Sequence, residues 1–376
     1  MLYMRLRTGL AYLLAGSIIA GCASSPRSPV VSAVVVVPEP RLSIPMGEFR
    51  GTPADLGRQQ GIQFRQTIID LDQNYLLNQV PSSARVEARL AAANFEVLMR
   101  PEHRDETEAL AQAVGVNRYD ILLAQCFLDL TAATGCSTIA LPPAASPDGV
   151  ARFGRNLDFP SLGVLNKHSA LMVYHPAGRN QFAAIGWPGM IGVLSGMNEY
   201  GLSLACMEVP RLPRLPTAMP YTLLYRTILE QCRTVDEAIA LLQQTPRQTA
   251  NNLMLMDAAG NRAVVEIRPE SVAVRRGMPG ATLISTNHQR GQDQDTPGYC
   301  WRYDTLHAES MSQFGKLDVP AIEKMLGHVV QGQAGEMTLQ SMVFEPANRV
   351  IYLATGSNAP ARTFEKIDLK SYFAAK

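Results

Sequence analysis

Apolar residues recur at helical spacing through the first third of the chain. This spacing covers residues 54–78, 84–99, 105–114 and 118–130. A repeat of this kind is typical of amphipathic helices that turn one face toward a core. Gly57 and Gly61 would allow such a helix to approach its neighbour closely, and Glu106 and Glu108 are expected on a solvated helix face. The sequence therefore predicts a mostly helical segment over residues 46–135.

The remainder, residues 136–376, shows a different pattern of short apolar runs bounded by turn residues. Such runs predict strands, and they cover residues 170–174, 182–186, 202–208, 253–257, 263–267 and 282–286. Two longer stretches, 222–244 and 319–330, return to helical spacing, and Asp236 two residues after Thr234 indicates a capped turn in the first of them. Helical and strand-rich segments in one chain indicate the α+β class.

A hairpin is predicted immediately after the helical segment. The Pro-Asp-Gly sequence at 147–149 is typical of a tight turn. The apolar segments on either side, residues 137–141 and 150–157, are predicted to pair as adjacent strands. Such a pairing would bring Arg155 and Asp158 back beside Cys136. A thiol, a guanidinium and a carboxylate would then meet at one end of a sheet.

Composition narrows the class of protein. The chain has 376 residues, 47% hydrophobic and 18% charged, which is enough to form a substantial globular core as one large domain or two small ones. A formal net charge of +1 gives no electrostatic reason to expect nucleic acid as a partner. Neither a phosphate-binding glycine motif nor zinc-type cysteine spacing is present, so no metal and no organic cofactor is expected.

The first residues are typical of a targeting segment. Arg5 and Arg7 precede a short apolar stretch at 9–20, which is too short for an ordinary membrane-spanning helix. Residues 19–22, Ile-Ala-Gly-Cys, resemble a bacterial lipobox, which predicts a signal peptide over 1–21 and lipidation of Cys22. Residues 22–45 would then form a tether. The protein is thus expected to be anchored by lipid in the bacterial cell envelope, on the outer membrane facing the periplasm; a plain secretory signal is the alternative.

Cys136 is the candidate nucleophile. A thiol with a pKa of about 8.5 needs a nearby base or cation to act as a nucleophile at neutral pH. No histidine lies between Cys136 and Asp158, and the next one downstream is His168. A cut before Cys136 would supply another base, an α-amino group with a pKa of about 7.7–8.0. Gly135 favours this route because glycine tolerates the strained backbone of an N-to-S acyl shift. The alternative is an ordinary buried cysteine.

The region around Cys136 resembles the nucleophile region of N-terminal-nucleophile (Ntn) hydrolases. More narrowly it is similar to the acyl-coenzyme A:isopenicillin N acyltransferase family and its relatives, the choloylglycine hydrolases. Further matching motifs follow in order: GTPADLGRQQG at 51–61, PGMIGVLSGMNEYGLSLA at 188–205, NNLMLMDAAGNRAVVE at 251–266, STNH at 285–288 and YCWRYDTL at 299–306. The resemblance extends over residues 45–360. It implies an αββα four-layer sandwich, with two sheets packed between helix layers.

The resemblance also implies roles for individual residues. Arg155 would favour the thiolate and hold the substrate, and Asp158 would orient the new α-amino group. Asn198 and Asn287 would donate to the oxyanion, and Arg302 would support the site and assist cleavage between Gly135 and Cys136. Other readings of the same residues are a surface ion pair for Arg155 and Asp158, turn residues for both asparagines, and a snorkelling surface arginine for Arg302.

The sequence therefore predicts an autoprocessed amidohydrolase that cleaves a linear acyl amide through a thioester. Residues 46–135 would become the small subunit and residues 136–376 the catalytic one. Its expected partners are a small-molecule amide with an apolar acyl group and, through the lipid anchor, a membrane. An acyltransferase and a non-catalytic envelope binding lipoprotein are the alternatives. The pairing of the four remaining cysteines is left open; these are Cys126, Cys206, Cys232 and Cys300.

Overall fold

The computed structural model of the protein describes residues 44–131, 135–209, 216–291 and 299–373. In these residues the helices are α2 (Pro53–Gln63), α3 (Arg65–Asp70), α4 (Arg85–Glu96), α5 (Pro101–Val114), α6 (Arg118–Leu130), α7 (Tyr221–Gln231), α8 (Val235–Gln244), α9 (Trp301–Ser312), α10 (Val319–Gly327) and α11 (Lys370–Phe373). A π-helical turn, Leu71–Leu76, continues α3.

The strands of the described residues form two sheets. The larger has the order β1-β4-β5-β6-β7-β8-β9-β10. Its strands are β1 (Met46–Gly51), β4 (Ala170–Pro176), β5 (Phe182–Gly186), β6 (Ser195–Asn198), β7 (Ser203–Glu208), β8 (Asn251–Met256), β9 (Arg262–Ile267) and β10 (Val272–Arg276). The smaller has the order β11-β2-β3-β12-β13-β14. Its strands are β2 (Gly135–Leu141), β3 (Arg152–Asp158), β11 (Leu283–Ser285), β12 (Thr338–Glu345), β13 (Val350–Thr355) and β14 (Glu365–Asp368).

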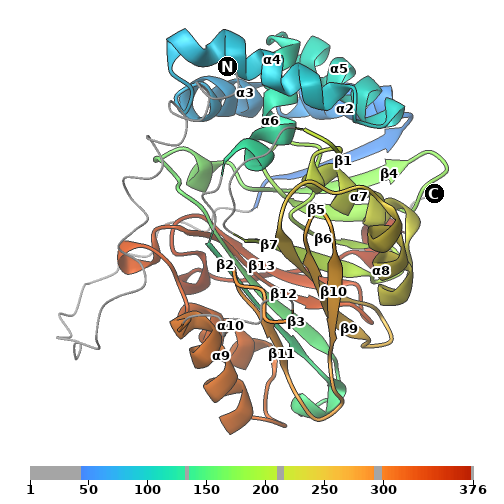
Figure 1. Cartoon of the computed structure of the whole chain (residues 1–376). Helices are drawn as coiled ribbons and strands as arrows, with labels where there is room; N and C mark the ends of the chain where they lie inside the picture. Colours follow the sequence, from blue (N-terminus) through green and yellow to red (C-terminus); the bar gives the residue numbers. More distant parts are fainter. Residues whose placement is uncertain (1–43, 132–134, 210–215, 292–298, 374–376) are drawn as a thin grey trace.

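The two sheets pack face to face between layers of helices (Figure 1). Across the interface, β2 contacts β7 and β8. On the outer side of the larger sheet, α2 contacts β1 and β4, α7 contacts β6, and α8 contacts β9. On the outer side of the smaller sheet, α9 and α10, drawn in orange, contact β2, β3, β11 and β12. The expected four-layer α+β sandwich is confirmed.

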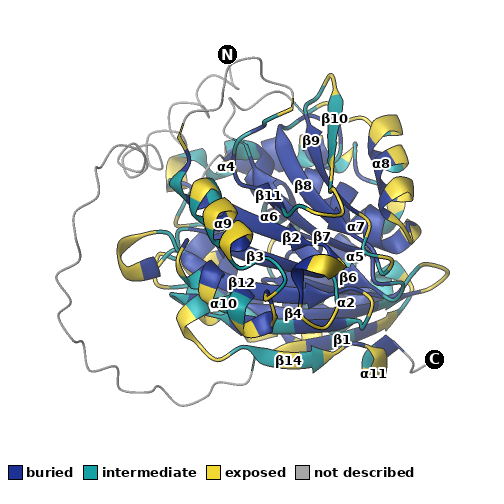
Figure 2. Cartoon of the chain, turned by 90° about the horizontal axis from the view of Figure 1, so that it is seen from below, coloured by how far each residue is buried: buried dark blue, intermediate teal, exposed yellow. Residues whose placement is uncertain are grey.

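Burial follows these layers. In Figure 2 the inner strands of both sheets are buried, whereas the edge strands β10 and β14 are partly exposed and α8 and α9 turn exposed residues outward. The core extends across both sheets and into the N-terminal helices, so that Phe49 of β1, Leu110 of α5 and Leu204 of β7 belong to one apolar cluster. The helical segment before Cys136 is therefore packed into the same core as strands of both sheets, whereas a separate apolar cluster joins the smaller sheet to α9 and α10.

The helical segment 46–135 is largely as predicted, with three differences. It begins with a strand, β1, which pairs in parallel with β4. The predicted helix 54–78 is interrupted at Phe64, which leaves helical geometry and packs its ring against Phe49. The expectation of a solvated Glu106 is wrong: its side chain is 1% exposed and forms a bidentate ion pair with Arg226.

In the second half, the predicted helix 222–244 is two helices. The chain becomes extended at Cys232, and Thr234 caps α8 by accepting a hydrogen bond from the N–H of Glu237 at 3.2 Å. The capped turn therefore starts a new helix instead of lying inside one. α9 carries no apolar stripe, because its buried residues are Arg302, Leu306 and Ser310. Because this stripe is missing, the sequence pattern did not predict a helix at this position.

Gly57 sets the approach of α2 to α5. A Cβ atom at Gly57 would lie 2.1 Å from the carbonyl oxygen of Glu106 and 3.0 Å from the nitrogen of Leu110. Both are backbone atoms and cannot rotate away, so Gly57→Ala would force the helices apart. We expect a loss of about 1–3 kcal/mol in the free energy of unfolding, measured by urea denaturation. Gly280→Ala is the control, since its Cβ would meet open space; equal effects of the two changes would contradict the packing argument.

None of the helices in the described ranges is long and apolar enough to cross a membrane. Cys22, the signal peptide and most of the expected tether lie outside the described residues.

Candidate active site

The predicted hairpin is present and forms the centre of the site. β2 pairs antiparallel with β3, which places Cys136 opposite Leu157, Thr138 opposite Arg155 and Gly135 opposite Asp158. Because side chains alternate along a strand, Cys136 and Arg155 project from the same face of the sheet. Arg155 donates from Nε to the hydroxyl of Ser195 in the facing sheet at 3.2 Å. The thiol and the guanidinium thus lie between the two sheets.

Arg155 is fully buried and interacts with the thiol. Its Nη1 donates to the carbonyl of Asn156 at 3.1 Å, and its Nη2 makes no hydrogen bond to any described residue. Burial raises the pKa of the Cys136 thiol, while the positive charges of Arg155 and Arg302 act in the opposite direction. The guanidinium therefore partly offsets the cost of forming a buried thiolate, which rules out the reading of Arg155 as a surface ion-pair residue.

The backbone of Cys136 is held by two of the candidate residues. Its N–H donates to Oδ1 of Asn287 at 2.8 Å. Arg302, at the start of α9, donates to the carbonyl of Cys136 and, at 3.0 Å, to the same Oδ1 of Asn287. Asn287 in turn donates from Nδ2 to the carbonyl of Glu208 at 2.6 Å. Arg302 is buried, which excludes the reading of a snorkelling surface residue, and the side chain of Asn287 is engaged with Cys136, Arg302 and Glu208.

Asp158 lies beside the bond between Gly135 and Cys136. One carboxylate oxygen accepts from Thr338 at 2.5 Å. The other, Oδ2, makes no hydrogen bond within the described chain, and the nearest cation is Arg302 at 3.7 Å. A Cβ at position 135 would lie only 3.2 Å from this oxygen, so glycine lets the strand approach the carboxylate. Burial raises the pKa of Asp158, and Arg302 opposes the increase.

Asn198 does not belong to this constellation, and its predicted role as an oxyanion donor is wrong. Its Nδ2 donates to the carbonyls of Leu229 and Cys232, and its Oδ1 accepts from the N–H groups of Tyr200 and Leu202. Its own N–H donates to the carbonyl of Leu202. All of its donors are therefore engaged in fixing the turn after β6 to the end of α7.

Three contacts of the site were not foreseen: the hydroxyl of Ser195, the carbonyl of Glu208 and the hydroxyl of Thr338. Thr338 stands opposite Asp158 in the register of β12 and β3. Predicting this contact would have required β12 to be recognised as the neighbour of β3. Ser195 lies in β6 and Glu208 in β7 of the larger sheet. Nothing in the spacing of these residues along the sequence indicates the contacts that they make.

All five cysteines in the described chain are free and buried, including Cys126, Cys206, Cys232 and Cys300. Cys300 precedes α9 and lies near Thr286, with 3.5 Å between sulfur and hydroxyl oxygen. Burial alone would raise its pKa, but hydrogen bonds from His288 and Thr286 outweigh burial and bring the pKa to about 6. His288 therefore interacts with Cys300, in agreement with its exclusion as a base for Cys136.

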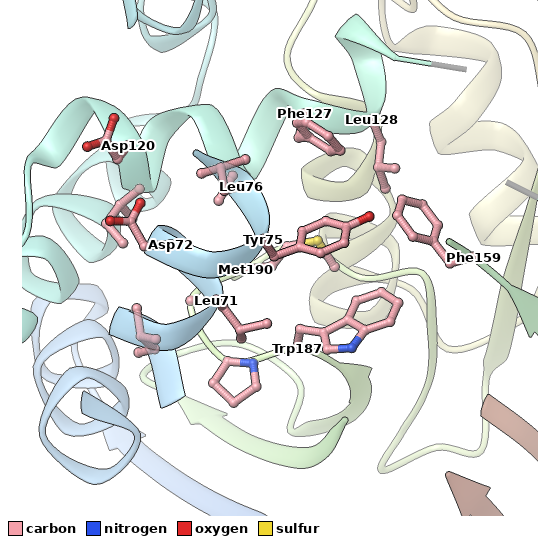
Figure 3. Close-up of a pocket in the computed structure, with 15 residues that line it drawn as sticks. Leu71, Asp72, Tyr75, Leu76, Asp120, Phe127, Leu128, Phe159, Trp187 and Met190 are labelled. Carbon is pink, nitrogen blue, oxygen red and sulfur yellow. The ribbon is translucent and has the colours of Figure 1, made fainter. Parts of the chain in front are cut away.

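A largely apolar pocket lies next to the hairpin. It contains about 640 Å³ of space, including its open mouth, and its wall includes Phe159, the residue after Asp158. The end of α3, the π-helical turn, α6 and the loop after β5 supply the rest of the wall. In Figure 3, Tyr75, Phe127, Leu128, Phe159 and Trp187 gather at one end of the pocket.

Comparison with known sequences identifies the family. Residues 145–360, more than half of the chain, match the family described as acyl-coenzyme A:6-aminopenicillanic acid acyl-transferase. The chain belongs to this acyltransferase family. The match confirms the resemblance stated from the motifs. It begins after Cys136 and includes the positions of Arg155, Asp158, Asn287 and Arg302.

Individual relatives of this acyltransferase family member are distant. Protein dcd1A of Dictyostelium discoideum is 22% identical over 303 residues, which span 72% of this chain and 67% of that protein. The Caenorhabditis elegans ortholog of N-acylethanolamine-hydrolyzing acid amidase is 17% identical, with a TM-score of 0.48 over 62% of this chain and 100% of that chain. Penicillin V acylase from Agrobacterium tumefaciens is 13% identical, with a TM-score of 0.41 over 62% and 92% of the two chains. These values are too low to support an argument about activity.

Proposed function

We propose that the protein is an N-terminal-cysteine amidohydrolase that activates itself by cutting the bond between Gly135 and Cys136. The observation that carries this proposal is the environment of the Cys136 nitrogen. That nitrogen donates to Asn287 at 2.8 Å, and Oδ2 of Asp158, which accepts no hydrogen bond from the described residues, lies beside Gly135. An α-amino group formed at this nitrogen would find two acceptors already in position.

Activation begins with attack of the Cys136 sulfur on the carbonyl carbon of Gly135. The carbon–nitrogen bond breaks, a carbon–sulfur bond forms, and the thiol proton passes to the leaving nitrogen, which becomes the α-amino group of Cys136. Water then hydrolyses the thioester and releases Gly135 as a carboxylate. Arg302 contacts the carbonyl of Cys136 and keeps the new N-terminus at the end of β2.

In the processed enzyme the α-amino group of Cys136 would take the thiol proton, while Asp158 and Asn287 accept its hydrogen bonds. The thiolate, stabilised by Arg155, attacks the carbonyl carbon of an amide. Collapse of the tetrahedral intermediate expels the amine, which leaves with the proton held by the α-amino group. Water then attacks the resulting thioester and releases the acid. Every step uses groups of this chain and water alone.

The apolar pocket supports an acyl group as the part of the substrate that is recognised. Phe159 follows Asp158 directly, so the pocket wall begins one residue from the carboxylate that would orient the nucleophile. An apolar acyl chain that leaves water for this pocket gains about 25 cal/mol for each Å² of surface buried. A linear amide with an apolar acyl group is therefore the proposed substrate class.

Asn287 accepts from the Cys136 nitrogen through Oδ1 and donates from Nδ2 to the carbonyl of Glu208; we propose that Nδ2 also donates to the oxyanion. Replacing it with alanine removes these interactions. We expect Asn287→Ala to lower kcat by about 10²–10³-fold, the usual cost of one oxyanion donor. Steady-state kinetics on an amide substrate would measure this. Asn198→Ala is the matched control, because the side chain of Asn198 fixes the turn after β6. We expect this variant to lose stability but to keep the same kcat per folded molecule. Similar losses of kcat in both variants would contradict the assignment.

The decisive experiment is intact mass and N-terminal sequencing of the purified chain from residue 23 onward, followed by a panel of linear amides. Two fragments, the second beginning at Cys136, together with hydrolysis of an amide, would support the proposal. A folded chain that remains in one piece would overturn it and favour the binding lipoprotein.

The family description favours one further candidate, an acyltransferase. Product analysis with an added amine would identify it by a new amide in place of the free acid.

We further propose that Cys22 carries a lipid that anchors the enzyme in the bacterial cell envelope, on the outer membrane. The support is the apolar stretch and lipobox-like sequence of residues 9–22. Metabolic labelling with palmitate in a bacterial host, with Cys22→Ala beside it, tests this. Label on the wild type alone is expected, and equal labelling of both chains would contradict the site.

A further inference from the structure

Two carboxylates interrupt the otherwise apolar lining of the pocket next to the β2–β3 hairpin. Asp72, from the π-helical turn, and Asp120, from α6, both belong to the wall. Figure 3 shows them together at the end of the pocket opposite Phe159 and Trp187. Phe159 adjoins Asp158, so the carboxylates occupy the end that is distant from the chemistry. A purely apolar chain would leave this polar end without a partner.

The two carboxylates differ in how well they are satisfied. Asp120 accepts two hydrogen bonds from Arg89, both at 2.7 Å. Asp72 is only 7% exposed, and its Oδ1 has no hydrogen-bond partner in the described residues. A buried acceptor of this kind carries the full cost of losing its water. Asp72 is therefore an acceptor that the fold places in the pocket wall and leaves unused.

The surrounding charges indicate what kind of donor would fit. Burial and the charge of Asp120 raise the pKa of Asp72 to about 6, and Arg89 and Arg85 oppose this rise. Two carboxylates thus face two guanidinium groups, and the local charge is already balanced. A second cation would upset this balance, whereas a neutral hydroxyl can donate one hydrogen bond without adding charge.

Resting on the amidohydrolase function proposed above, we propose that Asp72 accepts a hydrogen bond from a hydroxyl group at the far end of the substrate's acyl chain. The substrate class is then narrower than apolar amides in general. It comprises amides of acyl chains that are apolar along their length and hydroxylated at or near the terminal carbon. The distance between the thiol and Asp72 would select the length of the acyl chain, because only one length brings the terminal hydroxyl to the carboxylate.

The test is a matched series of fluorogenic anilides from hexanoyl to dodecanoyl, each with and without a terminal hydroxyl. At the best length we expect kcat/KM to be about tenfold higher for the hydroxylated member, the value of a hydrogen bond to a charged acceptor. Asp72→Leu should abolish this preference, so that the hydroxylated and plain members of each length are hydrolysed with the same kcat/KM. Asp105→Leu removes an exposed carboxylate of α5 and should leave the preference intact.

Binding gives a second readout that does not depend on catalysis. Calorimetric titration of Cys136→Ala with free terminally hydroxylated and plain fatty acids should show the same tenfold preference, again lost with Asp72→Leu. Absence of any amide hydrolysis, with this binding preference present, would overturn the proposed function and leave the site intact. Hydrolysis of plain acyl amides, with no hydroxyl preference at any length in either assay, would overturn the role of Asp72. A preference for a terminal ammonium over a hydroxyl would overturn it as well.

Discussion

Replacing Cys136 with alanine is expected to leave a single full-length chain and to abolish amide hydrolysis. In the proposed mechanism the sulfur of Cys136 is the attacking atom in both reactions. Removal of a nucleophile of this kind lowers kcat by about a millionfold in enzymes where it has been isolated. Because Cys136 is buried and alanine fits the same space, the fold should be retained. Intact mass would test for cleavage, an amide hydrolysis assay would test activity, and far-ultraviolet circular dichroism would test retention of the fold.

Cys232→Ala provides the matched control for this change. Cys232 is also a free, buried cysteine, and it contributes its backbone carbonyl, not its sulfur, to the contact with Asn198. This variant should be cleaved and active. If Cys136→Ala were still cut before residue 136, or still hydrolysed amides, the thiol would not be the nucleophile and Cys300 would be the next residue to test.

The second large effect is expected at Arg226, which α7 directs into the core. Its two terminal nitrogens donate to the carboxylate of Glu106 at 2.8 and 2.7 Å, and its Nε donates to Glu230 at 2.7 Å. The guanidinium also lies 5.0 Å from the ring centre of Tyr174. Arg226→Met would leave two buried carboxylates uncompensated. We expect a loss of about 3–5 kcal/mol in the free energy of unfolding, measured in urea.

Two further variants make this expectation specific. Arg226→Met combined with Glu106→Leu and Glu230→Leu removes all three charges and should recover part of the lost stability. Arg118→Met breaks a half-exposed pair with Glu96 and Glu108 and should cost less than about 1 kcal/mol. Equal losses for Arg226→Met and Arg118→Met would show that burial of the network is not what matters.

Local patterns in the sequence were sufficient for some elements. α6 occupies Arg118–Leu130 as predicted, because its apolar positions alone specify a helix. The hairpin of β2 and β3 followed from one turn between two apolar arms, and it brought Cys136, Arg155 and Asp158 together as expected. These are contacts between neighbours in the chain, for which pattern and turn chemistry are informative.

Elements defined by distant partners could not be predicted. β12 is fully buried yet contains Thr338, Gln340 and Ser341, whose side chains donate hydrogen bonds to Asp158, Ser169 and Asn156. Such a strand has no apolar alternation to detect. The same reasoning explains the misplacement of Asn198, whose partners in α7 and at Cys232 are defined only by the folded chain.

The parallel pairing of β1 with β4 has a consequence for the lifetime of the processed enzyme. A cut before Cys136 would separate β1 from β4 in the covalent chain but not in the sheet, where their backbones share hydrogen bonds. If heat or denaturant released the N-terminal fragment, β4 would become an exposed sheet edge, a surface prone to aggregation. Loss of the small subunit would then be irreversible. If the chain is cut as proposed, the durability of the enzyme would be governed by the rate of subunit release and not by an equilibrium between folded and unfolded chains.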